Sequence, residues 1–170
     1  MMNREEIRLR AVEPEDVDFI LECESDRNAA KWSDYRAPFS RTMLMSYALT
    51  YDADPFSSGQ LRLVAETPDR QRVGIVDLYD ISEKDSKGYV GICIHSDQRG
   101  KGLGLKSLEA LKALASERLG LYRLVAKISS ENPAALSMFK KAGFQSLAFL
   151  PGWHKIGRSL HDFYLMECIL

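Results

Sequence analysis

Cysteine is scarce in this sequence, and neither sign of charge is in excess. Its 170 residues include three cysteines, Cys23, Cys93 and Cys168, without a C-x-x-C spacing. An odd number of scattered cysteines favours reduced thiols in the cytoplasm over a disulfide framework or a zinc site. With 23 Lys and Arg against 24 Asp and Glu, the formal net charge is -1. Because no run of like charge occurs, we do not expect nucleic acid or anionic lipid as partners.

Long hydrophobic runs are absent as well. No stretch approaches the roughly 18 uncharged apolar residues of a membrane span, and the first six residues have no apolar segment behind their charges. We therefore expect no membrane contact and no signal peptide. His95, His154 and His161 lack the spacing of metal ligands, so no metal is expected.

The remaining composition is that of an ordinary globular protein, with 45% hydrophobic and 28% charged residues. A chain of this length can bury a sizeable core as one unit. No internal repeat, low-complexity tract or linker divides it. The sequence predicts a single domain over residues 1–170.

The hydrophobic pattern changes several times between a strand period and a helix period. Strands are predicted at residues 7–12, 61–66, 72–81, 89–94, 121–128, 144–150 and 159–169. Helices are predicted to open at 13–16, to run from a Ser40 cap to near 52–55, and to cover 107–119 and 132–142. This order predicts an α/β fold with a mixed sheet flanked by helices, antiparallel early and parallel around the strand-helix-strand crossover. Where the sheet changes sense, its strands are expected to splay and leave a cleft.

A glycine-rich loop follows the strand at 89–94 and leads into a helix. Gly100, Gly102 and Gly104 alternate with other residues, and Arg99 and Lys101 stand among them. Glycines allow close approach of the backbone, and a helix N-terminus attracts anions, so a phosphate or pyrophosphate is the expected guest. The spacing fits neither a Walker loop nor a dinucleotide fingerprint. The alternative is a turn that only joins strand to helix.

Residues 99–104, Arg-Gly-Lys-Gly-Leu-Gly, resemble the R/Q-x-x-G-x-G/A pyrophosphate loop of the GCN5-related N-acetyltransferases (GNAT). Residues 132–144 are similar to the N-x-x-A-x-x-x-Y-x-K-x-G-F segment of the same family. The order and spacing of the two motifs make the resemblance specific. Residues 9–16 are also typical of the branch that contains ribosomal-protein alanine and spermidine N-acetyltransferases.

The resemblance implies a centrally splayed sheet, acetyl-CoA as co-substrate and a primary amine as acceptor: a polyamine, a protein N-terminus or another small amine. A homodimer is compatible with it. The pantetheine arm of the co-substrate would pair with Ile92, Cys93 and Ile94, and Asn132 would touch the pantetheine or its acetyl end. The pyrophosphate would sit on the backbone amides of Arg99, Gly100, Lys101, Gly102, Leu103, Gly104 and Leu105.

The chain departs from the family at the position of the proposed proton donor. Phe139 stands where the family motif has Tyr, and a phenyl ring has no proton for the departing thiolate. A thiol with a pKa near 8.5 is a fair leaving group, so unaided departure of the thiolate is chemically tolerable. Water or another hydroxyl is the alternative, with Tyr164 and Tyr122 as candidates by residue type, although both are also explained as packed aromatics.

A general base must free the amine, because an ammonium ion cannot attack a thioester. Asp77 is the first candidate, because it is an acid inside an apolar strand, and Glu66 is the second. The alternative for Asp77 is a simple ion pair with a basic neighbour. Tyr89 and Val90 occupy the positions where many family members carry an acid.

Three further points remain open from the sequence. Cys93 could form an acetyl-cysteine, but a structural role is favoured because the family transfers acetyl directly. Acceptor selection is assigned to residues 25–54 and 149–160, and the acids Glu22, Glu24, Asp26 and Asp34 hint at a cationic substrate. The alternative to an enzyme is a catalytically degenerate acetyl-CoA-binding regulatory module.

Overall fold

The computed structural model describes residues 6–32, 38–51 and 54–170. The strands are β1 (Arg8–Ala11), β2 (Leu61–Glu66), β3 (Arg72–Ser82), β4 (Lys87–Ile94), β5 (Arg123–Ser129), β6 (Gln145–Ile156) and β7 (Ser159–Ile169). The α-helices are α1 (Val17–Ser25), α2 (Arg27–Ala30), α3 (Arg41–Thr50), α4 (Pro55–Ser58), α5 (Leu103–Glu117) and α6 (Pro133–Lys141). Two 3-10 turns, η1 (Pro14–Asp16) and η2 (Ser96–Gln98), precede α1 and the glycine loop.

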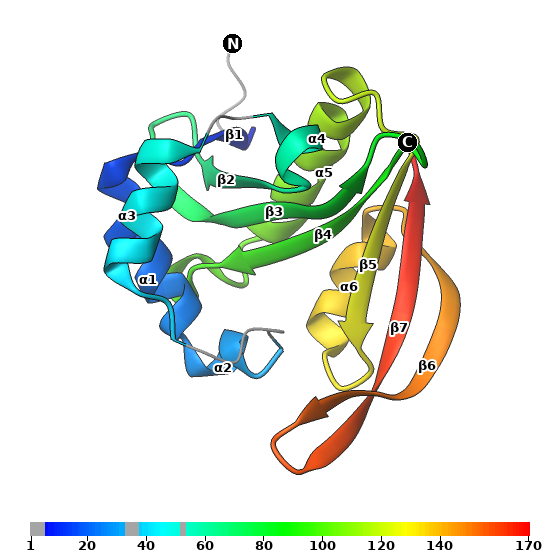
Figure 1. Cartoon of the computed structure of the whole chain (residues 1–170). Coiled ribbons are helices and arrows are strands. Elements are labelled where there is room, and N and C mark those ends of the chain that lie inside the picture. The colour runs from blue at the N-terminus through cyan, green and yellow to red at the C-terminus, as the bar shows by residue number, and fades with distance from the viewer. Residues whose placement is uncertain (1–5, 33–37, 52–53) are drawn as a thin grey trace.

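All the strands belong to one sheet in the order β1-β2-β3-β4-β5-β7-β6, as Figure 1 shows. Among the described strands, only the central pair, β4 and β5, is parallel, and the other neighbours are antiparallel. This confirms the predicted α/β class with a mixed sheet.

The two parallel strands separate soon after they meet. Their register pairs Lys87, Gly88 and Tyr89 of β4 with residues 123–125 of β5, and the ladder ends there. The remaining half of β4, from Val90 to Ile94, therefore leaves main-chain groups facing the gap between the strands. The predicted splay lies at this point.

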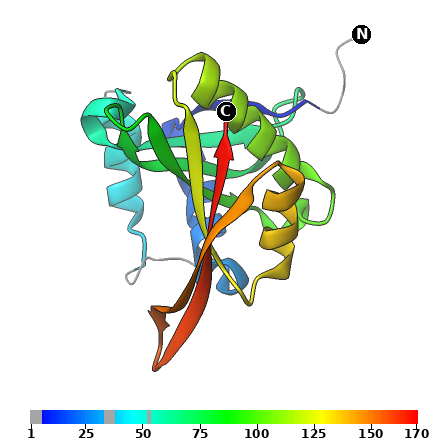
Figure 2. The same ribbon diagram turned by 90° about the vertical axis from the view of Figure 1, so that its right-hand side faces the viewer.

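Helices cover both faces of the sheet. Helices α1 and α3 lie on one face, and α5 and α6 lie on the other (Figures 1 and 2). Alternation along the strands divides the core accordingly: Val64 and Ile75 pack with the α1 and α3 side chains, whereas Val76 and Leu78 pack with those of α5. The far end of the β6–β7 hairpin projects beyond the body of the protein.

Several boundaries differ from the sequence-based expectation. Helix α5 begins at Leu103 rather than Ser107, because Gly102 adopts the left-handed conformation (φ 75°) and ends the loop there. Strand β6 continues to Ile156, beyond the expected end at 150, because it pairs with β7 up to the turn. The short helices α2 and α4 have too few residues to show a hydrophobic period, so the sequence did not predict them.

None of the described helices is long and apolar enough to cross a membrane.

Candidate functional site

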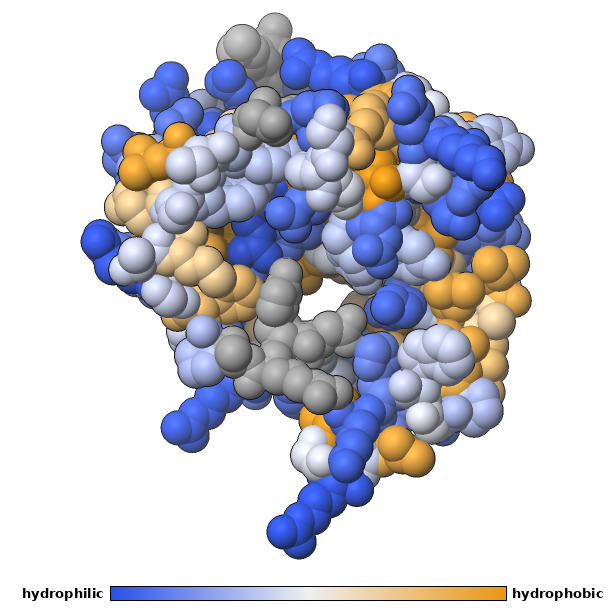
Figure 3. Space-filling model, in the orientation of Figure 1, coloured by the Kyte–Doolittle hydropathy of each residue, from blue (hydrophilic) through white to orange (hydrophobic). Residues whose placement is uncertain are grey.

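A cavity of about 830 Å³ lies where β4 and β5 separate and continues beneath α1 and α3. Its wall includes residues 90–94 of β4, residues 126–129 of β5, and side chains of the helices above. Figure 3 shows an opening at this place, between the α1–α3 side and the β5–β7 side of the molecule. The cavity thus joins the predicted cofactor region to the predicted acceptor region.

The glycine loop ends at the N-terminus of α5. Gly100 and Gly102 have φ values of 74° and 75°, and a Cβ atom at either position would meet nothing within 4 Å. No side chain caps α5 at Gly102, so its first amides are not satisfied by a cap. Glycine is required at 100 and 102 by the backbone, and the open amides fit an anionic group such as a pyrophosphate.

Gly104 has a different role from the other two glycines. A Cβ atom there would lie 2.7 Å from Sδ of Met138 on α6. Gly104 therefore permits close packing of α5 against α6, a reason that the loop motif does not reveal.

The two basic residues of the loop are engaged with protein groups. Arg99 donates from Nε to the Ile94 carbonyl at 2.9 Å, and its Nη2 lies 2.6 Å from Oδ2 of Asp26. Lys101 donates from Nζ to the Asp97 carbonyl at 2.7 Å. These contacts hold the loop against β4 and α2, and both side chains contribute positive charge beside the open amides.

The predicted pantetheine strand lines the cavity through Ile92, Cys93 and Ile94. Cys93 donates from Sγ to the carbonyl of Cys23 at 3.6 Å, and the two thiols also hydrogen-bond to each other. That hydrogen bond lowers the pKa of Cys93 and, together with burial, raises the pKa of Cys23. Both cysteines are free thiols, as is the buried Cys168.

Asn132 both caps a helix and lines the cavity. Its Oδ1 accepts a hydrogen bond from the amide of Ala135 at 3.1 Å, which satisfies the first turn of α6. The cap uses only the amide oxygen. Asn132, which is predicted to contact the pantetheine or its acetyl end, therefore also stabilises the start of α6.

Asp77 lies in the cavity wall, opposite Arg62 in the β2–β3 register. Arg62 donates from Nε and Nη2 to the two oxygens of Asp77 at 2.8 and 2.9 Å. Nη2 of the same guanidinium also lies 3.0 Å from Oε1 of Glu24 on α1. The ion pair expected as the alternative for Asp77 is thus present, and it brings a second carboxylate into the cavity.

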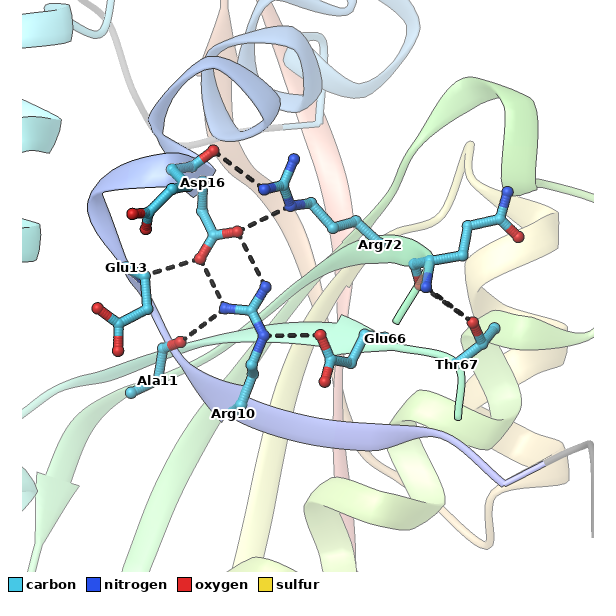
Figure 4. Close-up of polar contacts among 9 residues, drawn as sticks. Arg10, Ala11, Glu13, Asp16, Glu66, Thr67 and Arg72 are labelled. Carbon is cyan, nitrogen blue, oxygen red and sulfur yellow. Dashed lines mark hydrogen bonds and ion pairs between the residues drawn. The ribbon is translucent and has the colours of Figure 1, made fainter. Parts of the chain in front are cut away.

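Glu66 does not line this cavity. Figure 4 shows it in a separate network, where its Oε2 accepts from Nε of Arg10 at 2.7 Å. Arg10 also binds the buried Asp16, which Arg72 approaches from β3 at 2.8 Å. Of the two predicted bases, Asp77 therefore lines the cavity, whereas Glu66 belongs to the Arg10 network.

Phe139 lines the cavity, is 3% exposed and packs edge-on against Phe144. Neither Tyr164 nor Tyr122 belongs to the described cavity wall: Tyr164 packs against Phe149, and Tyr122 is exposed. Tyr47 of α3 does line it; this residue lies within the range 25–54 predicted for acceptor selection, but no motif in the sequence singled it out. Burial raises the pKa of Tyr47 to about 12.

The acids proposed for acceptor selection have different places. Glu24 lines the cavity, whereas Asp26 is bound to Arg99 and Glu22 lies 3.4 Å from Nε2 of His95, on a second hollow. Asp34 lies outside the described residues. The wall on this side also includes apolar and aromatic side chains, namely Trp32, Phe39, Met43, Leu44 and Tyr47.

Comparisons with known proteins agree with this architecture. The solved spermidine N-acetyltransferase of Vibrio cholerae, in complex with CoA and spermine, matches with a TM-score of 0.86 at 23% identity, over 98% of this chain and 96% of that one. The spermidine N(1)-acetyltransferase of Escherichia coli K12 is 22% identical over 97% of this chain and 82% of its own length. An L-methionine sulfoximine/L-methionine sulfone acetyltransferase of Pseudomonas paraeruginosa is 39% identical over 44% of this chain and 46% of its own length.

The family model described as an acetyltransferase (GNAT) domain matches residues 6–145. That range contains the glycine loop, the diverging strands β4 and β5, and the capped helix α6. The chain therefore belongs to the GNAT acetyltransferase family.

Proposed function

We propose that this acetyl-CoA-dependent N-acetyltransferase acts on a small amine of the polyamine type. The observation that carries the proposal is the acceptor side of the cavity, where two carboxylates, Glu24 and Asp77, lie beside an aromatic and apolar wall. A polyamine alternates ammonium groups with short methylene segments. Carboxylates complement the first and aromatic faces the second.

The cofactor side of the cavity supports the same function. The backbone amides of residues 99–105 would hold the pyrophosphate, and Ile92, Cys93 and Ile94 would hold the pantetheine arm along the unpaired half of β4. When bound, acetyl-CoA supplies an acetyl thioester to the amine. Residues 90–94 and 126–129 would exclude water from that end of the cavity.

Two of the relatives favour the polyamine class, since their names specify spermidine. The relative that acts on L-methionine sulfoximine and L-methionine sulfone matches less than half of the chain, but it marks a small amino-acid amine as the competing substrate class. Phe139, in place of the usual Tyr, is the observation that favours a regulatory acetyl-CoA-binding module instead.

A panel of acceptors tests the proposal. CoA release is measured with spermidine, spermine, L-methionine sulfone and a peptide with a free N-terminus, and acetyl-CoA binding is measured separately by calorimetry. We expect the highest kcat/KM for spermidine or spermine. Preference for the sulfone or the peptide would contradict the polyamine class, and acetyl-CoA binding without turnover on any amine would favour the regulatory module.

A further inference from the structure

Three charged side chains from three elements meet in the acceptor half of the cavity. Arg62 of β2 lies between Asp77 of β3 and Glu24 of α1, and the exposed fractions of the Arg62, Glu24 and Asp77 side chains are 11%, 14% and 26%. One guanidinium thus serves two carboxylates. The cluster holds one more negative charge than positive charge, and an incoming ammonium ion can balance it.

The guanidinium is shared unequally between the two acids. Both oxygens of Asp77 accept hydrogen bonds from Arg62, at 2.8 and 2.9 Å. Among the described residues, the guanidinium pairs with Glu24 through a single oxygen, Oε1, at 3.0 Å. A carboxylate oxygen that already accepts a charge-assisted hydrogen bond is a poorer proton acceptor. Glu24 is therefore the better placed of the two acids to accept a proton.

The position of Glu24 also suits proton transfer near the thioester. It lies in the last turn of α1, and it lines the same cavity as Cys93, which lies in the diverging half of β4. Glu24 thus shares the cavity with the predicted pantetheine strand and contacts the Arg62–Asp77 pair through Arg62.

Burial raises the proton affinity of Glu24, and the titratable and charged groups around it act in both directions. Among the described residues they are Arg62 from β2, Asp77 from β3, Cys93 from β4 and Cys23 from α1 itself. Burial raises the pKa of Glu24 above its ordinary value, the charge of Arg62 opposes the rise, and the charge of Asp77 adds to it. A higher pKa narrows the gap between this carboxylate and the ammonium ion that must lose a proton.

We propose that Glu24, rather than Asp77, is the general base that frees the acceptor amine; this inference rests on the proposed function. The ammonium ion gives one proton to the Glu24 carboxylate, which later releases it to solvent. The freed nitrogen forms a C–N bond to the acetyl carbon as the C–S bond breaks. The nitrogen loses its second proton and the departing thiolate gains one, so that one proton is released per turnover. Asp77 positions Arg62, and Arg62 positions Glu24.

The test compares Glu24→Gln with Asp77→Asn and with Glu22→Gln, on the best amine of the panel. Glu22 is a matched control because it is the same residue type on the same helix, has a side chain 66% exposed and lies outside the cavity. The kcat and KM of CoA release are measured from pH 6 to 10, with acetyl-CoA affinity and thermal unfolding as separate readouts.

We expect Glu24→Gln to lower kcat/KM by about 10²-fold at neutral pH, the low end of general-base effects. Its rate should then rise about tenfold per pH unit as the free amine becomes available, so that the deficit closes toward pH 10. Acetyl-CoA affinity should not change. Asp77→Asn and Glu22→Gln should not show this tenfold rise per pH unit, whatever the effect of Asp77→Asn on the absolute rate.

A wild-type pH profile in folded Glu24→Gln would overturn the assignment, as would a tenfold rise in rate per pH unit in Asp77→Asn alone. If Glu24→Gln does not fold, Glu24→Asp keeps a carboxylate on a shorter side chain. Glu24→Asp should retain the wild-type pH profile at a reduced rate. A rate that rises with the fraction of free amine would overturn the proposal. Absence of turnover in the wild type would overturn the proposed function together with this inference, whereas turnover with an unchanged Glu24→Gln profile would overturn only the inference.

Discussion

Arg10 donates hydrogen bonds to both carboxylate oxygens of the buried Asp16, at 2.6 and 3.0 Å (Figure 4). This pair fastens β1 to the turn that opens α1. Because removal of one partner leaves the other charge uncompensated, we expect Asp16→Ala to lower the free energy of unfolding by about 3 kcal/mol. This loss of stability is at the low end for buried ion pairs, because Arg10 still pairs with Glu66 in the variant.

Urea unfolding of Asp16→Ala and of Asp18→Ala checks this expectation. Asp18 lies two residues away and pairs with Arg41 on the surface, at 2.9 Å. Exposed pairs add little to stability, so the control should unfold close to the wild type. Equal midpoints for the two variants would show that the buried network is not stabilising.

The same carboxylate predicts how stability depends on pH. Burial alone raises the pKa of Asp16, but hydrogen bonds from Arg10 and the Glu13 amide, with the charges of Arg10 and Arg72, outweigh it and hold this pKa below its ordinary value of 3.8. The stabilisation is therefore complete above pH 3.8 and is lost as the pH falls through the lower folded-state pKa. The difference in unfolding free energy between wild type and Asp16→Asn should be constant near neutral pH and shrink below pH 3.8; a constant difference down to pH 2 would contradict this.

Gly102 is the position at which the cofactor loop can be tested. We expect Gly102→Val to lose most of the acetyl-CoA affinity, because a β-branched residue resists φ 75° and the start of α5 must shift. Gly120, at the other end of α5, is the matched control, since it has φ 62° and also nothing within 4 Å of a Cβ atom. Calorimetry should show near-normal affinity in Gly120→Val. Normal acetyl-CoA affinity in folded Gly102→Val would show that the pyrophosphate does not bind at this loop.

Asn132 can be tested separately as a cap and as a cofactor ligand. Asn132→Ser keeps a capping oxygen, so its unfolding free energy should stay near that of the wild type, whereas Asn132→Ala should lose about 1 kcal/mol. Both variants lack the amide nitrogen, and both should bind acetyl-CoA more weakly or turn over more slowly. Full function in Asn132→Ser would assign the residue to capping alone.

Substitution of Phe139 tests whether the departing thiolate needs a positioned acid. If the thiolate leaves without such an acid in the wild type, Phe139→Tyr should raise kcat by up to about 10²-fold, because the new hydroxyl would lie at the cavity wall. An unchanged kcat would indicate that another group already supplies the proton. A hydroxyl buried beside Phe144 without a partner would then lower the unfolding free energy by about 1–3 kcal/mol. The measurements are kcat on the best amine and thermal unfolding.

The sequence by itself determined the features that depend on near neighbours in the chain. Hydrophobic periods predicted the order of strands and helices, because burial on one face repeats every two or every 3.6 residues. Glycines at 100 and 102 predicted the anion loop because each φ value is a local property. The helix that starts near Asn132 was predicted from its period, whereas the cap from Asn132 to the Ala135 amide appeared only in the structure.

Only the tertiary structure decided which charged residues meet. Glu66 and Asp77 are both acids on neighbouring apolar strands, yet one joins Arg10 and Asp16 and the other joins Arg62 and Glu24 in the cavity. Those partners depend on the β2–β3 register and on where α1 packs, which are set by contacts between segments far apart in the chain. An ion pair between such segments leaves no periodic signal in the sequence, because its geometry exists only after the sheet has assembled.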